Sequence, residues 1–309
     1  MTIHLLEELS TPALDALDRD RTIAVLTVSP LEVHGPHLPL GVDAFTARHL
    51  AVSVAERVTS ERPGWSAVLA PTLHLGSFTF EAAGTVSVRQ RVVRDAVAGY
   101  GASLARAGFR HILIANGHGG PGHLVALDEA AALVSRRYGV TMASLTGHVA
   151  WQFLRGRLIP KIEAALERRL SDDERAALAE DSHGGWWETS IMLLLRPDLV
   201  DARYRSLEPA RYRLVHRLLP NYALKNGGLG YVGHPALADA SFAKAASEVL
   251  LAEVMRLVDD LLDGRRSAPP RSPFYAVPFL RTNFLPALCG AAVAGVALAW
   301  LRRRWLDRA

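Results

Sequence analysis

Short apolar runs alternate with longer amphipathic segments along most of this chain. Four runs rich in Val, Ile, Leu and Ala have the length of buried strands. They lie at residues 22–28, 66–70, 111–115 and 140–145. Four longer segments repeat apolar residues at helical spacing. They lie at residues 44–58, 90–107, 124–138 and 240–262. This alternation predicts βαβ units, and therefore an α/β domain whose mainly parallel sheet is covered by helices on both faces.

From Gly264 onward the pattern changes. Residues 264–283 are rich in Pro, Arg and Ser, which is typical of a linker. Residues 284–301 (FLPALCGAAVAGVALAWL) contain no charged residue, and as a helix they would span about 27 Å. Arginines flank this segment on both sides, and residues 302–309 form a basic tail. We therefore expect a single transmembrane helix that anchors the chain by its tail. The alternative is a C-terminal helix packed on the body or in an oligomer contact.

The net charge of +4 is distributed unevenly. Residues 264–309 carry eight arginines and a single acid, Asp307, whereas residues 1–263 carry 27 Lys and Arg against 30 Asp and Glu. The body is thus slightly acidic and gives no reason to expect nucleic-acid binding. Its length is sufficient for one large domain with a substantial core.

The only cysteine, Cys289, lies in the C-terminal tail. The body therefore has no disulfide and no thiolate ligand, which fits a reducing compartment and leaves His, Asp and Glu as metal ligands. The first ten residues, MTIHLLEELS, include acids and no long apolar core, so we expect no signal peptide in them. We expect a membrane-anchored protein whose body lies in the cytoplasm.

Ionisable side chains gather just after two of the predicted strands. The loop LEVHGPHLPLGVD contains Glu32, His34 and Asp43, and the motif NGHGG contains His118. Loops beyond the carboxyl ends of parallel strands are where sites collect. Several ionisable groups beside buried strands would be costly to desolvate unless a cation or close partners neutralised them. This favours a divalent metal such as Zn²⁺, Mn²⁺ or Fe²⁺ over a purely structural role for these side chains.

A second polar segment, SHGGWWETSIMLLLRPDLVD, contains His183 and Glu188 before an apolar helix. Gly184 and Gly185 allow close approach of the backbone. Glu188 lies near the start of the helix, where it either interacts with the helix macrodipole or binds metal. The local chemistry leaves both roles open. Four other histidines are weaker candidates for contact with substrate or metal, namely His37, His74, His123 and His148.

Four motifs occur in order along the chain: LEVHGPHLPLGVD, GSFTFEAAGTVSV, NGHGG and HGGWWETSIMLLLRPDLVD. Together they resemble the creatininase (creatinine amidohydrolase) family over residues 20–260. The resemblance implies a three-layer α/β/α fold, often assembled as hexamers, and a two-metal site that hydrolyses amide bonds of small, frequently cyclic substrates. It also implies individual roles: Glu32 and His118 hold one metal, His34 holds the other, Asp43 bridges the two, and His183 shuttles a proton at the scissile amide.

The chain departs from creatininase proper at two positions. Creatininase has a glutamate two residues after the histidine of NGH, where this chain has Gly120, and a glutamate before the catalytic histidine, where this chain has Ser182. The Gly-Gly form resembles other branches, including formamide hydrolases of flavin or deazaflavin pathways and the peptide-trimming enzyme of mycofactocin maturation. Some branches keep an asparagine where this chain has Pro121. Creatinine is therefore not the expected substrate, and we expect Glu188 to replace the missing glutamate as a metal ligand.

The resemblance predicts hydrolysis of a C–N amide bond in a cyclic amide, a formamide or a small peptide. Two divalent ions (Zn, Mn or Fe) in the domain at residues 1–263 would activate water, and His183 would protonate the leaving nitrogen. A small-molecule amide and further copies of this chain are the expected partners. The alternative is a non-catalytic family member that acts as a membrane-tethered binding module.

Overall fold

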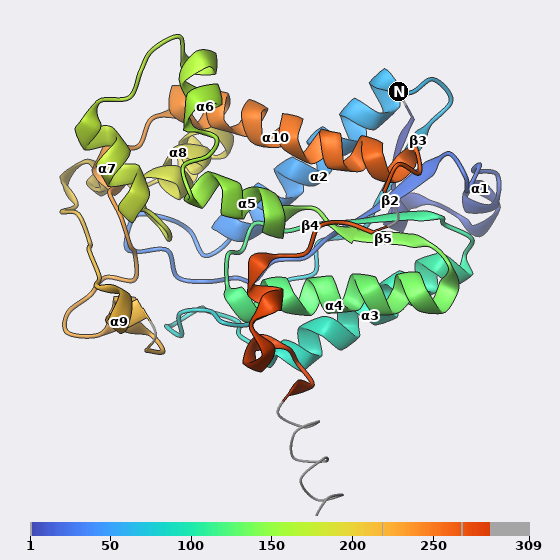
Figure 1. The fold of residues 1–309 in the computed structure, drawn as a ribbon, viewed down its shortest axis with the longest axis horizontal. Coiled ribbons are helices and arrows are strands. Elements are labelled where there is room, and N and C mark those ends of the chain that lie inside the picture. The colour runs from blue at the N-terminus through green and yellow to red at the C-terminus, as the bar shows by residue number, and fades with distance from the viewer. Residues whose placement is uncertain (1, 218, 267, 285–309) are drawn as a thin grey trace, which may run out of the picture.

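A five-stranded parallel sheet forms the centre of the computed structural model, which describes residues 2–217, 219–266 and 268–284 (Figure 1). The strands are arranged in the order β1-β3-β2-β4-β5. Their bounds are β1 (Ile3–Leu5), β2 (Thr22–Thr27), β3 (Ser66–Leu69), β4 (His111–Ala115) and β5 (Thr141–Ser144). The four predicted strands are confirmed. The sequence does not predict β1, because three residues are too few to show a periodic pattern.

Helices cover both faces of the sheet (Figure 1). One layer contains α2 (Val42–Glu61), α5 (Thr146–Leu154) and α10 (Ala240–Leu262), and the other contains α3 (Gln90–Arg106) and α4 (Pro121–Tyr138). Ile23 and Val25 of β2 are buried in a core with the first layer, whereas Ala24 and Leu26 are buried in a core with the second. Successive side chains of a strand point to opposite faces, so β2 contributes to both cores. The predicted α/β architecture, with helices on both faces of a parallel sheet, is confirmed.

A third apolar cluster holds the remaining longer helices against α10. These helices are α6 (Ile159–Leu166), α7 (Asp172–Glu180) and α8 (Trp186–Leu195). Trp186 of α8 stacks on Phe242 of α10, with ring centroids 4.7 Å apart, and both rings are fully buried. The start of α8, which carries part of the candidate site, is therefore fixed by packing. The shorter helices are α1 (Thr11–Asp15), α9 (Leu214–Arg217), η1 (Leu6–Glu8), η2 (Pro197–Leu199), η3 (Ala202–Ser206), η4 (Tyr222–Leu224), η5 (Pro235–Leu237), η6 (Pro273–Ala276) and η7 (Pro278–Leu280).

The second half of the predicted linker lies against the domain. Residues 271–284, named here the C-terminal strap, cross α4 (Figure 1). The backbone N–H of Ser272 donates to Asp128 Oδ2 of α4 at 2.8 Å. Gln90 Nε2 of α3 donates to the carbonyl oxygen of Leu280 at 2.7 Å. Burial raises the pKa of Asp128 to about 7. The composition of this segment predicts a linker, but these hydrogen bonds dock it on both helices.

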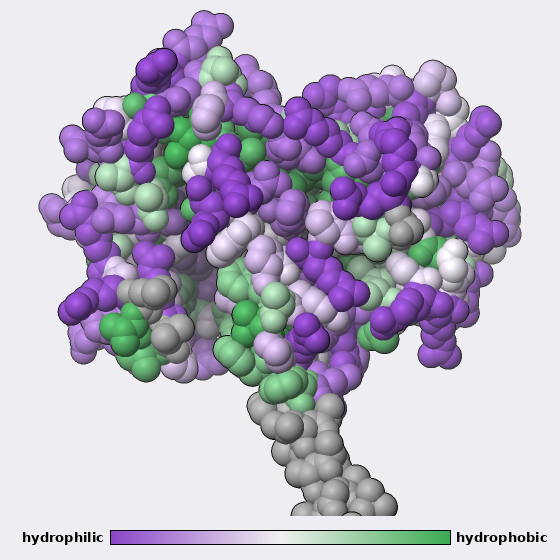
Figure 2. Space-filling model, viewed as in Figure 1, coloured by the Kyte–Doolittle hydropathy of each residue, from purple (hydrophilic) through white to green (hydrophobic). Residues whose placement is uncertain are grey.

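The predicted transmembrane helix at 284–301 and the basic tail at 302–309 lie outside the described residues, except for Phe284. Among the helices that the structure describes, none combines the length and the apolar character that a membrane span requires. Figure 2 shows apolar side chains gathered over the strap, near the end of the described chain. Phe279 of the strap is 68% exposed.

Candidate metal centre

The loop after β2 carries three predicted ligands into the protein interior. The backbone N–H of Glu32 donates to the carbonyl oxygen of Leu40 at 2.9 Å, which closes the loop and places Asp43 in the first turn of α2. Glu32, His34 and Asp43 are all buried. His34 Nδ1 lies 2.9 Å from the carbonyl oxygen of Glu32. A ring N–H that donates to this oxygen leaves Nε2 as the ligand atom.

Asn116 organises the loop after β4, which carries His118. Its Oδ1 accepts the backbone N–H of His118 at 3.0 Å, and its Nδ2 donates to the carbonyl oxygen of His118 at 2.7 Å. Because β4 pairs with β2, this loop meets the start of α2. A Cβ at Gly117 would lie 2.2 Å from the carbonyl oxygen of Asp43, so this approach requires glycine. The sequence interpretation missed Asn116, although its place in the NGH motif was a usable signal.

The predicted ligands form two groups that share Asp43. In the first group, His118 Nδ1 lies 3.0 Å from Glu32 Oε2 and 3.1 Å from Asp43 Oδ2. In the second, His34 Nε2 lies 3.3 Å from Asp43 Oδ1 and 3.4 Å from Glu188 Oε2. Within each group the ligand atoms all lie within 4.8 Å of one another. The two oxygens of Asp43 face different groups, as expected of a carboxylate that bridges two ions.

The donor atoms of both groups fit divalent cations. Within the described part of the chain, Glu32 Oε2, His34 Nε2 and Asp43 Oδ2 are buried and have no hydrogen-bond partner. Buried polar atoms without partners are destabilising unless an ion or ligand satisfies them. Carboxylate oxygen together with imidazole nitrogen is a ligand set that suits Zn²⁺, Mn²⁺ and Fe²⁺.

The electrostatics of the site also favour a cation. Burial alone would raise the pKa of Asp43, but the imidazoles of His34 and His118 outweigh it and hold this pKa well below its usual range. Burial opposes protonation of His34, yet the carboxylates of Asp43 and Glu188 raise its pKa to about 10. Glu32 and Asp43 likewise raise the pKa of His118 well above its usual value, against the effect of burial. The Asp43 carboxylate therefore stays ionised, and a metal that binds here would displace protons from the two imidazoles.

Asp181, which lies two residues before His183 in the sequence, fixes the start of α8. Its Oδ1 accepts the backbone N–H of Trp186 at 2.7 Å, and its Oδ2 accepts that of Trp187 at 2.9 Å. A Cβ at Gly185 would lie 1.9 Å from Asp181 Oδ1, so this contact requires glycine. The Gly-Gly pair indicated a close approach in the sequence, but it did not identify Asp181 as the partner.

The structure places His183 directly beside the two ligand groups. Its ring stacks on that of His34, with centroids 4.1 Å apart. His183 Nε2 lies 2.7 Å from the carbonyl oxygen of Val33, and Nδ1 lies 3.9 Å from Glu188 Oε2. A third possible ligand group consists of Glu32, His34 and His183. The residues singled out for metal binding and for catalysis are therefore neighbours in space.

Glu188 has the geometry for both roles that the sequence left open. Its Oε2 accepts the backbone N–H of Gly184 at 2.5 Å, ahead of the first turn of α8. The same oxygen lies 3.4 Å from His34 Nε2 and belongs to the ligand group of His34 and Asp43. One carboxylate can thus order the glycine-rich segment and serve as a ligand.

The four weaker histidines lie outside the ligand groups found in the described part of the chain. His37 Nε2 lies 2.9 Å from Thr189 Oγ1, and burial lowers the pKa of His37 to about 4. His123 Nε2 lies 3.1 Å from Asn116 Oδ1, and burial lowers the pKa of His123 well below its usual value. Both side chains are buried and connect neighbouring segments through these contacts. His74 is exposed and His148 is half-buried.

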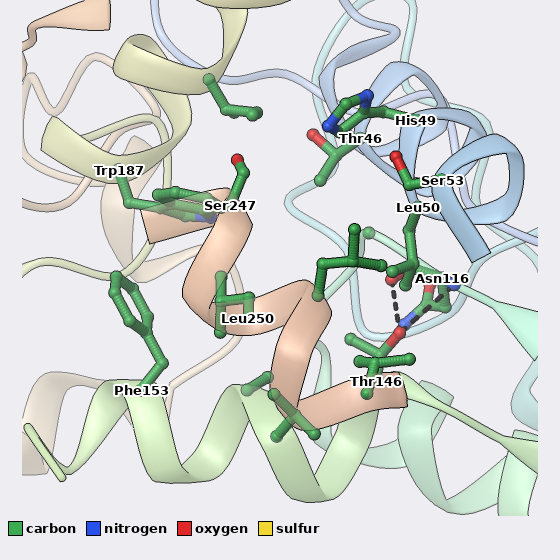
Figure 3. A pocket seen from close by; sticks show the side chains of 16 residues that line it. Thr46, His49, Leu50, Ser53, Asn116, Thr146, Phe153, Trp187, Ser247 and Leu250 are labelled. Atoms are coloured by element: carbon green, nitrogen blue, oxygen red, sulfur yellow. Dashed lines mark hydrogen bonds between the residues drawn. The ribbon is translucent and has the colours of Figure 1, made fainter. Parts of the chain in front are cut away.

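A cavity of about 130 Å³ reaches the loop that carries His118 (Figure 3). Its lining comes mainly from α2, α5, α8 and α10, and it reaches Asn116 and Gly117 of the NGH loop. Figure 3 shows the hydroxyl groups of Thr46, Ser53 and Ser247 among mostly apolar side chains. The predicted ligands and His183 do not line it. The cavity therefore contacts Asn116 and Gly117, which position the His118 loop, and does not contact the predicted ligands themselves.

Comparison with known proteins gives a consistent result over the domain. The family model for creatininase, described as creatinine amidohydrolase, matches residues 7–258. The mycofactocin precursor peptide peptidase of Mycobacterium ulcerans is 27% identical over 250 residues, which cover 77% of this chain and 85% of that protein. The creatinine amidohydrolase of Pseudomonas putida is 29% identical over 188 residues, which cover 58% of this chain and 66% of that protein.

Solved structures share the fold. The structure described as "Creatininase Mn" superposes with a TM-score of 0.61 at 23% sequence identity, covering 84% of this chain and 98% of its own. A mutant creatininase described as "Zn-Zn type" superposes with a TM-score of 0.59 at 22% identity, covering 84% of this chain and 97% of its own. The region matched by the family model contains every strand of the sheet except β1, and every predicted site residue.

Proposed function

Since the chain belongs to the creatininase family of amide-bond hydrolases, we propose that its site around Asp43 binds two divalent ions and cleaves a small C–N amide with water. The observation that carries this proposal is the sharing of Asp43 between two buried ligand groups, Glu32 with His118 and His34 with Glu188. The presence of both groups favours catalysis over a non-catalytic binding module.

Each residue has a role that its contacts support. The two ligand groups would hold the metal ions, which would supply a water of lowered pKa and a Lewis acid for the substrate carbonyl. Asp43 holds the two ligand groups at a fixed separation. His183 carries the proton for the leaving nitrogen. Its Nε2–H donates to the carbonyl oxygen of Val33, which leaves Nδ1 as the atom that exchanges the proton. Stacking on His34 keeps this ring beside the reacting amide.

The proposed metals and substrates draw on the relatives. Zn, Mn or Fe is the proposed ion, and solved creatininases carry Mn or Zn in their descriptions. The proposed substrates are a cyclic amide, a formamide or a small peptide. Of the two relatives described above, one is a precursor peptide peptidase and the other a creatinine amidohydrolase, which supports testing peptides beside lactams. The predicted homo-oligomer stays a prediction.

His183→Gln tests the catalytic assignment. We expect kcat to fall about 10²- to 10⁴-fold on the best substrate found by screening lactams, formamides and short peptides, because the leaving nitrogen loses its proton donor. Metal content should stay at the wild-type level. His74→Gln, at an exposed position, is the control. If the His183 variant instead lost metal together with activity, His183 would be a ligand, and unchanged kcat would remove it from the mechanism.

We also propose that residues 284–301 anchor the chain in a membrane, with the domain on the cytoplasmic side. The support is a run of 18 uncharged residues flanked by arginines, together with the exposed apolar Phe279 close to the last described residue, Phe284. The full chain should fractionate with membranes, whereas a chain truncated after Phe284 should remain in the soluble fraction. If both remain soluble without detergent, the anchor is wrong.

A further inference from the structure

A turn after β3 contains a strained residue beside the metal centre. Phe78 has φ +61°, a left-handed backbone conformation that bulky residues rarely adopt. Such outliers persist only where the surrounding structure imposes them, and they cluster at functional sites. The turn formed by Ser77–Phe80, named here the Phe78 turn, lies against the ligands of the first group.

The Phe78 turn determines which atoms of two ligands remain free. The carbonyl oxygen of Ser77 lies 3.2 Å from His118 Nε2, so a ring N–H that donates to it leaves Nδ1 to face Asp43. The backbone N–H of Phe80 donates to Glu32 Oε1 at 2.5 Å. This contact leaves Glu32 Oε2 free, which is the oxygen 3.0 Å from His118 Nδ1. Hydrogen bonds of this kind orient metal ligands and fix their tautomers.

The same turn reaches the proposed proton carrier. The ring of Phe80 packs edge-on against the ring of His183, with centroids 4.8 Å apart. One turn of four residues therefore contacts a carboxylate ligand, an imidazole ligand and the catalytic histidine.

The turn also leaves no space for a side chain at position 120. A Cβ at Gly120 would lie 2.9 Å from the carbonyl oxygen of Ser77, 3.0 Å from that of Phe78 and 2.4 Å from His118 Nε2. The backbone of the turn therefore occupies the space that a side chain at position 120 would need. The carboxylate of the second group comes from Glu188 of α8.

One side of the Phe78 ring packs on Gly122 at the start of α4, while the residue is 51% exposed overall. A Cβ at Gly122 would lie 2.0 Å from Cε2 of this ring and 2.4 Å from Cδ2. The ring therefore lies directly on the first turn of α4, where only glycine leaves it room. This contact joins the strained residue to the helix that follows the NGH loop.

We propose that Phe78 is a positioning residue of the metal centre: its ring, seated on Gly122, holds the Phe78 turn so that Glu32 Oε2 and His118 Nδ1 face one ion and position 120 is closed to a side chain. This inference rests on the proposed function in one respect, which is that these groups bind metal. Phe78 acts through its neighbours Ser77 and Phe80, whose backbone atoms contact His118 and Glu32.

The test measures the affinity of purified full-length protein for Zn²⁺ and Mn²⁺ by competition with a chelator. Phe78→Gly removes the ring and accepts the left-handed backbone. We expect its affinity to fall about 10- to 100-fold, the usual loss when a group that orients a ligand is removed. The melting temperature of the metal-free variant should match that of Phe279→Gly, a control at an exposed phenylalanine. If Phe78 had only a structural role, the loss of metal affinity would be accompanied by a lower melting temperature of the metal-free protein.

A double-mutant cycle tests the contact itself. Gly122→Ala should displace the ring and weaken metal binding to a similar degree. In the Phe78→Gly background the same substitution should have little further effect, because its action passes through the ring. The inference would be overturned if Phe78→Gly bound metal with wild-type affinity, or if the two substitutions had fully additive effects on affinity in the double variant. Either result would leave the proposed metal centre itself unaffected. A wild-type protein that binds neither ion would remove the metal centre and this inference with it.

Discussion

Asp43→Ala is expected to remove most of the bound metal and to reduce amide hydrolysis to the background rate. Asp43 is the only residue shared by the two ligand groups around it, with one carboxylate oxygen 3.1 Å from His118 Nδ1 and the other 3.3 Å from His34 Nε2. The substitution would therefore take one ligand from each of the two proposed ions. Removing a group that merely orients a ligand costs about 10- to 100-fold in affinity, so the loss here should exceed 100-fold.

The measurement is metal per chain by elemental analysis after dialysis, together with activity. Asp95→Ala, at an exposed position beside Arg94, is the matched control and should keep the wild-type metal content. Circular dichroism and melting temperature show whether the variant folds, since a carboxylate in the first turn of a helix also contributes about 0.3–1 kcal/mol through the helix dipole. A folded Asp43→Ala protein with its full complement of metal would refute the site.

Glu188→Gln separates the two roles of this side chain. Glutamine keeps an oxygen that can accept the Gly184 N–H but loses the negative charge that a cation needs. We expect the ion at His34, Asp43 and Glu188 to be lost while the ion at Glu32, Asp43 and His118 remains, so that metal content falls to about half of the wild-type value. Activity should fall at least about 100-fold if the second ion takes part in the reaction, because metal ions stabilise transition-state charge by several kcal/mol.

Stability distinguishes this outcome from a capping role. The hydrogen bond to Gly184 survives in the glutamine variant, so the metal-free protein should lose no more than about 1 kcal/mol of its free energy of unfolding. Glu56→Gln, at an exposed position of α2, controls for the loss of one charge. Unchanged metal content in Glu188→Gln with a small loss of stability would identify Glu188 as a structural residue only.

Most residues of the candidate site could be predicted from the sequence. Buried parallel strands leave a strong apolar signal, and the loops after two of them carry Glu32, His34 and His118. Because β2 and β4 are neighbours in the sheet, these loops meet at one edge. Asp43 follows as part of the next helix. Four of the proposed ligands are thus predictable from strand order and loop chemistry.

Residues that act through the backbone were not predictable in this way. Asn116 and Asp181 hold the site by accepting backbone N–H groups, and any Asn or Asp looks the same in a sequence until its partners are known. Phe78 reads as an ordinary apolar residue, since its left-handed backbone becomes visible only in three dimensions. The strap has the composition of a linker, and its docking depends on Asp128 and Gln90, which lie far from it in the sequence.

Docking of the C-terminal strap limits how far Phe284, the last described residue, can move relative to the rest of the domain. A free chain of the length of residues 264–283 would let its two ends separate by about 25 Å on average and in any direction. The hydrogen bonds of Ser272 and Leu280 to α4 and α3 remove most of that freedom. The exit at Phe284 therefore keeps a constant distance and direction from Asp43. The anchor proposed for residues 284–301 would thus be attached to the domain at one defined point beside α3 and α4, and not through a freely moving linker.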